Sequence, residues 1–413
     1  MPNPTRKIMM IAPTSFFSDY GGHIRILEET LALQSVGNNI TIVTYYKGRD
    51  LPGVDIRRTA PLPYHTDYEV GSSRHKLAFD VYLAAKAWQV ARRERPDLIH
   101  AHMHEGALIG GVLSRLLRIP LVFDFQGSLT GEMVDHQFLK PEGLLHRAVW
   151  GVERVIDHMP HAILTSSVQA REGLLHEFGV PASRVHPLPD CVDLRRFDPA
   201  LFTAVEKDTL RARLGIPPDR PIVAYLGLLT DYQGIPDLLQ AAQTLKQAGK
   251  DIHFLIMGFP NLTHYRRLAA DMGVTDRVSF PGKIPYNEAP LWLSLGDVAV
   301  SAKVSATEGS GKLLNYMALK LPIVAYDTAV HREYLGDLGV FVPPHDAVGL
   351  AHALADLIQD PARATALGQA LRQRVREKFS WVQAAQQIDE LYEQLLNPHQ
   401  ATAVGDETIA TRS

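Results

Sequence analysis

The sequence predicts an α/β protein made of two doubly wound domains that face a central cleft. Short apolar runs alternate with longer segments of helical apolar spacing, and this alternation occurs in two series. A charged stretch punctuated by prolines, near residues 199–220, separates the two series. Strand–helix–strand order implies parallel strands with right-handed crossovers, and such sheets bind ligands at the carboxyl ends of their strands.

The first series begins with a buried apolar run and predicts a domain over residues 1–198. Two serines, Ser166 and Ser167, can cap the helix that follows them. Gly37 ends the first helical pattern. We expect strands at 7–12, 40–44, 97–100, 120–125, 162–165 and 185–188, and helices at about 24–36, 108–116, 143–158 and 168–178.

The second series predicts a domain over residues 221–380, after a linker at 199–220. The tail at 397–413 has no apolar period, so we expect it to be disordered. We expect strands at 222–226, 252–257, 278–280, 298–301, 323–326 and 340–342, and helices at about 235–247, 263–272, 288–295, 311–319, 346–358, 361–378 and 382–396.

Composition excludes several classes of protein. The 413 residues are 46% hydrophobic and 21% charged, which excludes global disorder and allows about two to three domains. The net charge of −3 excludes a broad electrostatic hold on nucleic acid. Cys191 is the one cysteine, so no disulfide framework is possible and a reducing compartment is expected.

Hydropathy predicts a soluble, cytoplasmic protein. The first apolar run, 8–12, is shorter than a signal peptide needs, and no window approaches the length of a membrane span. Peripheral contact with the inner membrane surface stays open.

A glycine-rich loop before a helix is the strongest candidate for a binding site. Gly309, Ser310 and Gly311 precede a helix that starts near Lys312. Glycines, a helix N-terminus and a lysine in the first turn all favour an anion, while Glu308 can accept hydrogen bonds from sugar hydroxyls. The spacing is not that of a Walker motif. A solvated helix cap with a capping carboxylate is the alternative.

A second loop, after the first strand, carries two glycines before a helix. Gly21 and Gly22 would let a phosphate or a sugar approach the backbone, and His23 follows them. A plain tight turn is the alternative reading.

Three histidines and two further polar residues follow strands of the first domain. His100 and His102 point the same way along a strand, and His104 follows. A metal site is possible on this spacing, but no carboxylate or cysteine pattern supports it. Hydrogen bonding to a hydroxyl is the preferred role. Gln126 ends a strand and Glu132 lies just beyond it.

Six segments, in order, resemble the retaining glycosyltransferases of family 4, the glycosyl transferases group 1. Their similarity covers about residues 7–396. The segments are Gly21–Gly22, PDLIHAH at 96–102, LPDCVDLRRFDP at 188–199, AYLGLLTDYQGIPDLLQA at 224–241, DRVSFPGKIPYNEAPLWLSLGDVAVSA at 276–302 and EGSGKLLNYMALKLPIVAYD at 308–327.

The resemblance implies the GT-B architecture, in which two Rossmann-like domains face a cleft. It implies transfer of a sugar from a nucleotide-diphosphate donor to an acceptor hydroxyl on a glycan, a lipid or a small molecule. The donor would bind the second domain and the acceptor the first, which the helix at 382–396 would complete. No cofactor or metal would be needed, and the leaving phosphate would deprotonate the acceptor.

The resemblance also implies roles for individual residues. The donor diphosphate would rest on Gly309–Lys312 and on the amides of Gly21 and Gly22. Glu308 would hold the donor sugar and Asn315 the ribose, while Gln126 and His102 would line the reaction centre. The acceptor side would be formed by His23, His104 and Glu132.

Of the positions that depart from the family pattern, three bear on the donor site. The family's diphosphate-binding arginine falls on Leu228, its lysine on Gln233, and its second acid on Asn315. Some branches carry a lysine three residues before that acid, which matches Lys312, and Lys303 is a second source of charge. These departures keep two alternatives open: a catalytically silent nucleotide-sugar-binding protein, and a nucleotide-sugar epimerase for which Glu132 and Asp135 are the only hints.

Overall fold

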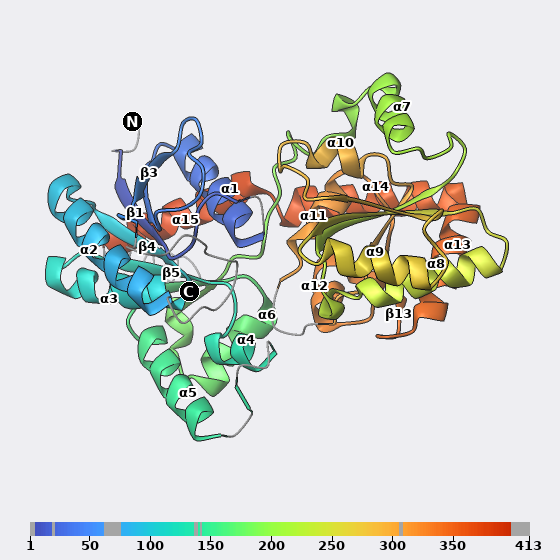
Figure 1. Cartoon of the computed structure of the whole chain (residues 1–413). Helices are drawn as coiled ribbons and strands as arrows, with labels where there is room; N and C mark the ends of the chain where they lie inside the picture. The colour runs from blue at the N-terminus through green and yellow to red at the C-terminus, as the bar shows by residue number, and fades with distance from the viewer. Residues whose placement is uncertain are drawn as a thin grey trace, which may run out of the picture. The chain divides into compact units, whose positions relative to one another are not determined.

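The computed structural model describes residues 5–18, 21–61, 76–135, 139–140, 143–304 and 309–397 (Figure 1). Contacts divide the chain into two units. Unit 1 comprises Met1–Pro189 and Trp381–Ser413, and unit 2 comprises Asp190–Ser380. The division falls at residue 189, nine residues before the predicted boundary at 198. The predicted disorder of the tail concerns residues that, from 398 on, lie outside the described ones.

Unit 1 contains a seven-stranded sheet in the order β3-β2-β1-β4-β5-β6-β7. Every pair of neighbouring strands is parallel, as the alternation of strands and helices predicts. The strands are β1 (Lys7–Ala12), β2 (Asn39–Thr44), β3 (Asp55–Arg58), β4 (Leu98–His102), β5 (Leu121–Phe125), β6 (Ala162–Thr165) and β7 (Val185–Pro187).

Helices cover both faces of this sheet. They are α1 (Gly21–Ser35), α2 (Lys76–Glu94), α3 (Met103–Leu117), α4 (Leu129–Asp135), α5 (Leu144–Asp157), α6 (Val168–Glu172) and α15 (Trp381–Leu396). Ser167 caps α6 by accepting a hydrogen bond from the amide of Ala170 at 3.1 Å, as predicted. Short helical turns follow at Gly173–Glu177 and Ala182–Arg184. The sequence analysis did not identify β3, α2 or α4.

The strands of unit 1 present different side chains to the two faces. Met9 and Ile99 pack in the apolar core formed with Phe79 and Leu83 of α2. The alternate residues of β4, His100 and His102, face α1 and α15, because side chains of a strand point alternately to opposite faces. The polar side chains of β4 therefore lie on one face only.

Helix α15 lies beside α1, although more than 340 residues separate them in sequence (Figure 1). Asp389 accepts hydrogen bonds from Arg6 at 2.5 Å and from Asn38 at 2.7 Å. Arg6 also pairs with Glu393. These polar contacts anchor the last described helix to the start of unit 1.

Unit 2 contains a six-stranded parallel sheet in the order β10-β9-β8-β11-β12-β13. The strands are β8 (Ile222–Leu228), β9 (His253–Phe259), β10 (Val278–Gly282), β11 (Val298–Ser301), β12 (Ile323–Tyr326) and β13 (Val340–Val342). All six predicted strands are present, within three residues of the expected ends.

The helices of unit 2 are α7 (Ala204–Arg213), α8 (Ile235–Gln247), α9 (Leu262–Asp271), α10 (Ala289–Leu293), α11 (Gly311–Ala318), α12 (Ala329–Leu335), α13 (Ala347–Gln359) and α14 (Pro361–Lys378). Short turns lie at Pro199–Leu201, Asp231–Gln233 and Gly336–Leu338. The segment expected to be a linker carries α7, whose capping box joins Thr203 and Glu206. The sequence analysis did not identify α7 or α12.

Both sheets reverse their strand order once, so each has a topological switch point. It lies between β1 and β4 in unit 1 and between β8 and β11 in unit 2. Ligands of doubly wound sheets bind outside the carboxyl ends of the strands at this point. No helix among the described residues is long and apolar enough to cross a membrane.

Candidate active site

In unit 2 the switch point brings together the loops after β8 and β11 and the start of α11. Lys312, in the first turn of α11, reaches the loop after β8: its Nζ lies 2.5 Å from Oε1 of Gln233 and 3.4 Å from the hydroxyl of Tyr225. The same Nζ lies 4.5 Å from the centroid of the Tyr225 ring. The arrangement places a half-buried positive charge at the carboxyl end of β8.

Gly227 has no side chain, which leaves space next to the Lys312 ammonium. A Cβ at this position would lie 2.8 Å from the Tyr225 hydroxyl and 3.3 Å from Nζ of Lys312. Any larger residue would therefore displace one of these groups. Leu228, where the family pattern expects an arginine, is half-buried at the end of the same strand.

The glycine-rich loop is held from two sides. Lys303, nearly fully buried, donates a hydrogen bond to the carbonyl of Gly309 at 3.0 Å. A Cβ at Gly309 would lie 2.7 Å from Oδ2 of Asp190, which accepts a hydrogen bond from the Tyr334 hydroxyl at 3.1 Å. Lys303 therefore supports the loop from within.

Helix α11 starts at Gly311, and the side chain of its N-cap residue, Ser310, forms no capping hydrogen bond with the first turn. The hydroxyl of Ser310 is buried and has no hydrogen-bond partner among the described residues. The half-buried Asn315 lies one turn further along the helix. Glu308 lies outside the described residues.

His331, which the sequence analysis did not single out, lies behind both lysines. Its Nδ1 donates to the carbonyl of Tyr326 at 2.6 Å, and its Nε2 accepts from the Ser301 hydroxyl at 3.0 Å. Burial lowers the pKa of His331 to about 4, and the charges of Lys312 and Lys303 act in the same direction. The ring is therefore neutral at pH 7.

In unit 1 the switch point carries Gly22 and Gln126. A Cβ at Gly22 would lie 3.5 Å from Oε1 of Gln126, an ordinary contact distance, so the two residues are neighbours. Gln126 Nε2 donates to Oδ2 of Asp124 at 2.9 Å. Asp124 in turn accepts two hydrogen bonds from Arg25, at 2.9 and 2.7 Å. Burial opposes ionisation of Asp124, but the Arg25 charge holds the pKa of this carboxyl well below its usual range.

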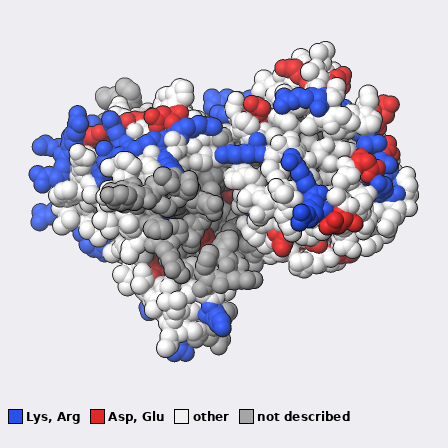
Figure 2. Space-filling view, viewed as in Figure 1, with Lys and Arg blue, Asp and Glu red and all other residues white. Residues whose placement is uncertain are grey.

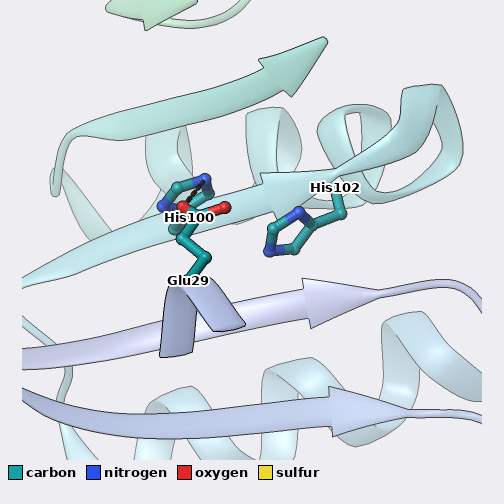
Figure 3. Close-up of side chains that lie close together, drawn as sticks. All are labelled: Glu29, His100 and His102. Carbon is teal, nitrogen blue, oxygen red and sulfur yellow. Dashed lines mark ion pairs between the residues drawn. The ribbon is translucent and has the colours of Figure 1, made fainter. Parts of the chain in front are cut away.

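Two histidines of β4, His100 and His102, lie close to this group of side chains (Figure 3). His102 is fully buried, with Nδ1 3.1 Å from Oδ2 of Asp124, so it reaches Gln126 through that carboxylate. His100 lies between Tyr392, whose hydroxyl is 2.5 Å from Nδ1, and Glu29, whose Oε1 is 3.3 Å from Nε2. No carboxylate pattern in the sequence accompanies these histidines, but the structure places Asp124 of β5 and Glu29 of α1 beside them.

The structure buries two of the three predicted acceptor-side residues. His23 is fully buried, with Nδ1 accepting from the Ser18 amide at 2.9 Å and Nε2 in contact with the Thr14 hydroxyl. His104 is also buried, and Glu132 is half-buried beside Gly127. A direct contact with substrate requires exposure that His23, His102 and His104 lack here. The ring nitrogens of each contact protein groups.

His104 lies between two carboxylates. Its Nε2 is 3.4 Å from Glu153 Oε1 and 3.5 Å from Asp157 Oδ1. Burial disfavours the charged ring, but the two carboxylates outweigh it and raise the pKa of His104 to about 10. Glu153 also accepts hydrogen bonds from the amides of Leu129 and Thr130 at the start of α4. This cluster therefore ties α3, α4 and α5 together.

Two doubly wound units, each with polar loops at its switch point, define the GT-B architecture of glycosyltransferases. Two family descriptions match this chain: "Glycosyltransferase Family 4" over residues 21–196 and "Glycosyl transferases group 1" over residues 206–374. The chain belongs to this glycosyltransferase family and is a glycosyltransferase.

Individual proteins agree with this assignment. The chain is 26% identical to a 2-deoxystreptamine glucosyltransferase of Streptomyces kanamyceticus, over 90% of this chain and 98% of that protein. Sucrose-phosphate synthase from Thermosynechococcus elongatus has a similar structure, with a TM-score of 0.79, 22% identity and coverage of 95% and 100%. Anabaena Alr3699/HepE in complex with UDP-glucose gives a TM-score of 0.73 at 17% identity, with coverage of 94% and 100%. These two structures show the shared fold.

Proposed function

We propose that this glycosyltransferase takes its sugar from a nucleotide-diphosphate donor, retains the anomeric configuration, and holds the donor diphosphate with Lys312. The observation that carries the proposal is the 2.5 Å contact between Nζ of Lys312 and Oε1 of Gln233. The family's lysine would occupy position 233, so Lys312 supplies from α11 the charge that this position lacks. An ammonium beside a developing phosphate anion stabilises bond breaking without reorganisation.

Neighbouring groups complete the donor site. The amides at the start of α11 bind the phosphate oxygens because they lie at the positive end of the helix and the Ser310 side chain does not cap them. Asn315 contacts the ribose, and Glu308 holds the hydroxyls of the donor sugar. Lys303 positions the loop through the carbonyl of Gly309.

In unit 1, the amides of Gly21 and Gly22 contact the donor diphosphate, Gln126 lines the reaction centre, and Glu132 contributes to the acceptor side. His102 positions Gln126 through Asp124, to which both side chains are hydrogen-bonded. In the reaction, the bond between the anomeric carbon and the diphosphate oxygen breaks while the acceptor oxygen attacks the same face. The acceptor proton passes to the leaving phosphate, so the step needs neither a protein nucleophile nor a metal ion.

Donor binding is measured first, by calorimetry in EDTA, with nucleoside diphosphates and their sugars. UDP-glucose leads the panel because a structural neighbour is titled as its complex. Binding of a sugar nucleotide at micromolar Kd, with the nucleoside alone bound far more weakly, is the expected result. A panel that leaves the protein unbound would contradict the donor site and favour the catalytically silent alternative.

Products separate the remaining alternatives. An aminocyclitol such as 2-deoxystreptamine is the first acceptor, because a relative is named for it. NMR of the product gives the anomeric configuration, and inversion would contradict the retaining mechanism. Conversion of the donor sugar into its epimer without transfer would favour the epimerase.

We further propose that an anionic lipid surface covers the outer faces of α3 and α5. These helices pack against each other and expose apolar side chains along their lengths, with Leu116 64% and Leu144 86% exposed. The exposed apolar residues are Leu108, Val112 and Leu116 on α3, and Leu144, Leu145, Val152 and Val155 on α5.

Positive side chains accompany this apolar stripe. Arg115, Arg118, Arg147 and Arg154 are exposed on or next to the same helices. Figure 2 shows mostly uncoloured surface over α5, with Lys or Arg near its lower end. Apolar side chains flanked by arginine fit the interface of an anionic bilayer.

Vesicle sedimentation tests this surface. We expect the protein to bind phosphatidylglycerol vesicles and not phosphatidylcholine vesicles, and L144Q/L145Q to lose at least half of that binding. Leu201→Gln is the matched control, because Leu201 is an exposed leucine of unit 2. Equal binding by L144Q/L145Q and the control would refute the proposal.

A further inference from the structure

Four polar atoms without hydrogen bonds meet inside unit 1. Glu29 of α1 and His100 and His102 of β4 are fully buried, and one ligand atom from each lies within 4.8 Å of the others (Figure 3). Both carboxylate oxygens of Glu29 and Nε2 of both histidines have no hydrogen-bond partner within the described part of the chain. Nε2 of His100 lies 3.3 Å from Oε1 of Glu29.

This arrangement is costly without a further group. A buried polar atom without a hydrogen bond destabilises the folded protein, and a buried carboxylate without one destabilises it more. Native proteins contain few such atoms, and each one points to a ligand, a water or an ion.

The contacts of the two Nδ1 atoms, which face away from the cluster, determine how the Nε2 atoms of His100 and His102 are presented to it. Nδ1 of His102 faces Asp124, whose carboxylate is held by Arg25, so this nitrogen carries the proton and donates it. Nδ1 of His100 lies 2.5 Å from the hydroxyl of Tyr392, which accepts a hydrogen bond from this nitrogen in the tautomer that leaves Nε2 free to bind a metal. Each ring then presents an unprotonated Nε2 toward the cluster. Metal-binding histidines are held by such outer partners, commonly a carboxylate.

We propose that Glu29, His100 and His102 bind a divalent transition-metal ion of the zinc class. Two imidazole nitrogens and one carboxylate oxygen suit Zn²⁺, whereas Ca²⁺ and Mg²⁺ require more oxygen ligands. Ligand atoms around Zn²⁺ lie about 3.3 Å apart because each lies about 2.0–2.1 Å from the ion. The 3.3 Å between Nε2 of His100 and Oε1 of Glu29 already matches that spacing.

The ion is structural. Its ligands are fully buried, and it joins α1 to β4. Through Tyr392, the second partner of His100, it also supports α15. This site lies in unit 1 and is separate from the donor phosphates, so it does not conflict with a transfer step that needs no metal.

A second buried cluster provides the control. His104, Glu153 and Asp157 are also close together, but Glu153 there caps α4 with both oxygens. Asp157→Asn removes a buried acid beside a histidine, as Glu29→Gln does, without changing the proposed ligands.

The test uses the full chain without a histidine tag, stripped by a chelator and titrated with ZnCl₂ in a calorimeter. We expect one zinc ion per chain in the wild type and in D157N, and at least a 100-fold weaker Kd in E29Q. Zinc should raise the melting temperature of the first two proteins only. Zinc binding by E29Q with wild-type affinity, or none by the wild type, would overturn the proposal.

A measurement on the wild type alone covers the case in which E29Q does not fold. X-ray absorption of the zinc-loaded protein should show two imidazoles and one oxygen ligand. A spectrum with no imidazole, or with sulfur from Cys191, contradicts the site.

Discussion

Replacing Lys312 with methionine removes one positive charge from the switch point of unit 2 and keeps most of the side-chain volume. Nζ of Lys312 lies 2.5 Å from Gln233 and 3.4 Å from the Tyr225 hydroxyl, so a phosphate in this position would receive a charged hydrogen bond. Such a bond contributes about 1.5–3 kcal/mol, which corresponds to about a 10- to 150-fold increase in the Kd for a nucleoside diphosphate. Calorimetry in EDTA measures the change directly.

Two further variants make this prediction specific. Lys320→Met is the matched control, since Lys320 lies on the same segment but is exposed two residues beyond α11. Gln233→Lys in the K312M background returns an ammonium to within reach of the same position, and we expect it to recover at least fivefold of the lost affinity. If K312M binds within threefold of K320M, the charge of Lys312 does not hold the diphosphate.

Three other predictions follow from the same contacts. Gly227→Ala should weaken diphosphate binding about tenfold in calorimetry, because its Cβ would lie 3.3 Å from Nζ of Lys312 and 2.8 Å from the Tyr225 hydroxyl; unchanged binding would show that the close approach is unnecessary. The depressed pKa of His331, about 4, provides stability that is present above pH 6.5 and is lost as the pH falls through 4. Urea unfolding should therefore show that the advantage of the wild type over H331N shrinks by about 3 kcal/mol between pH 7 and pH 4, and a constant difference would contradict the assignment. Asp389→Ala should destabilise the protein by about 2–3 kcal/mol in urea unfolding, because buried Arg6 and Asn38 lose a shared acceptor, although Glu393 still pairs with Arg6; a loss below 0.5 kcal/mol would refute this role of Asp389.

The sequence was sufficient to predict the parallel sheets, because buried parallel strands are apolar runs. The strands at Ile8–Ala12 and Ile222–Leu226 can be predicted from the sequence for this reason. It was not sufficient for β3, whose four residues are Asp55, Ile56, Arg57 and Arg58 and therefore carry no apolar run. Edge strands are less buried, and their pattern is correspondingly weaker.

Helix α2 was missed although its signal is present. Phe79, Leu83 and Ala87 recur every four residues and are buried in the core of unit 1. The interposed charges and small residues lower its mean hydropathy, so the stripe is visible only when the period is counted.

The site was predicted where its residues are neighbours in sequence. Gly309, Ser310, Gly311 and Lys312 form one segment, and their spacing predicts an anion site directly. Asp190, Tyr225 and His331 come from distant segments, and no local spacing links them to this loop. The same limit explains the metal prediction: Glu29 is 71 residues from His100 in sequence, so only the packing of α1 on the sheet brings a carboxylate to the histidines.

Because position 233 is a glutamine and not a lysine, the positive charge of the site comes from a different element of the fold. A lysine at this position would bring its charge from the loop after β8, whereas Lys312 brings its charge from the first turn of α11. Its ammonium must pass the face of Tyr225, and the 4.5 Å contact with that ring stabilises the cation while it remains half-buried. Tyr225 is in turn fixed by its hydrogen bond to the carbonyl of Leu228 at 2.8 Å. The aromatic ring, the glycine beside it and the neutral Gln233 therefore form one arrangement that accepts a lysine from the helix. A second positive charge at position 233 would instead compete with it.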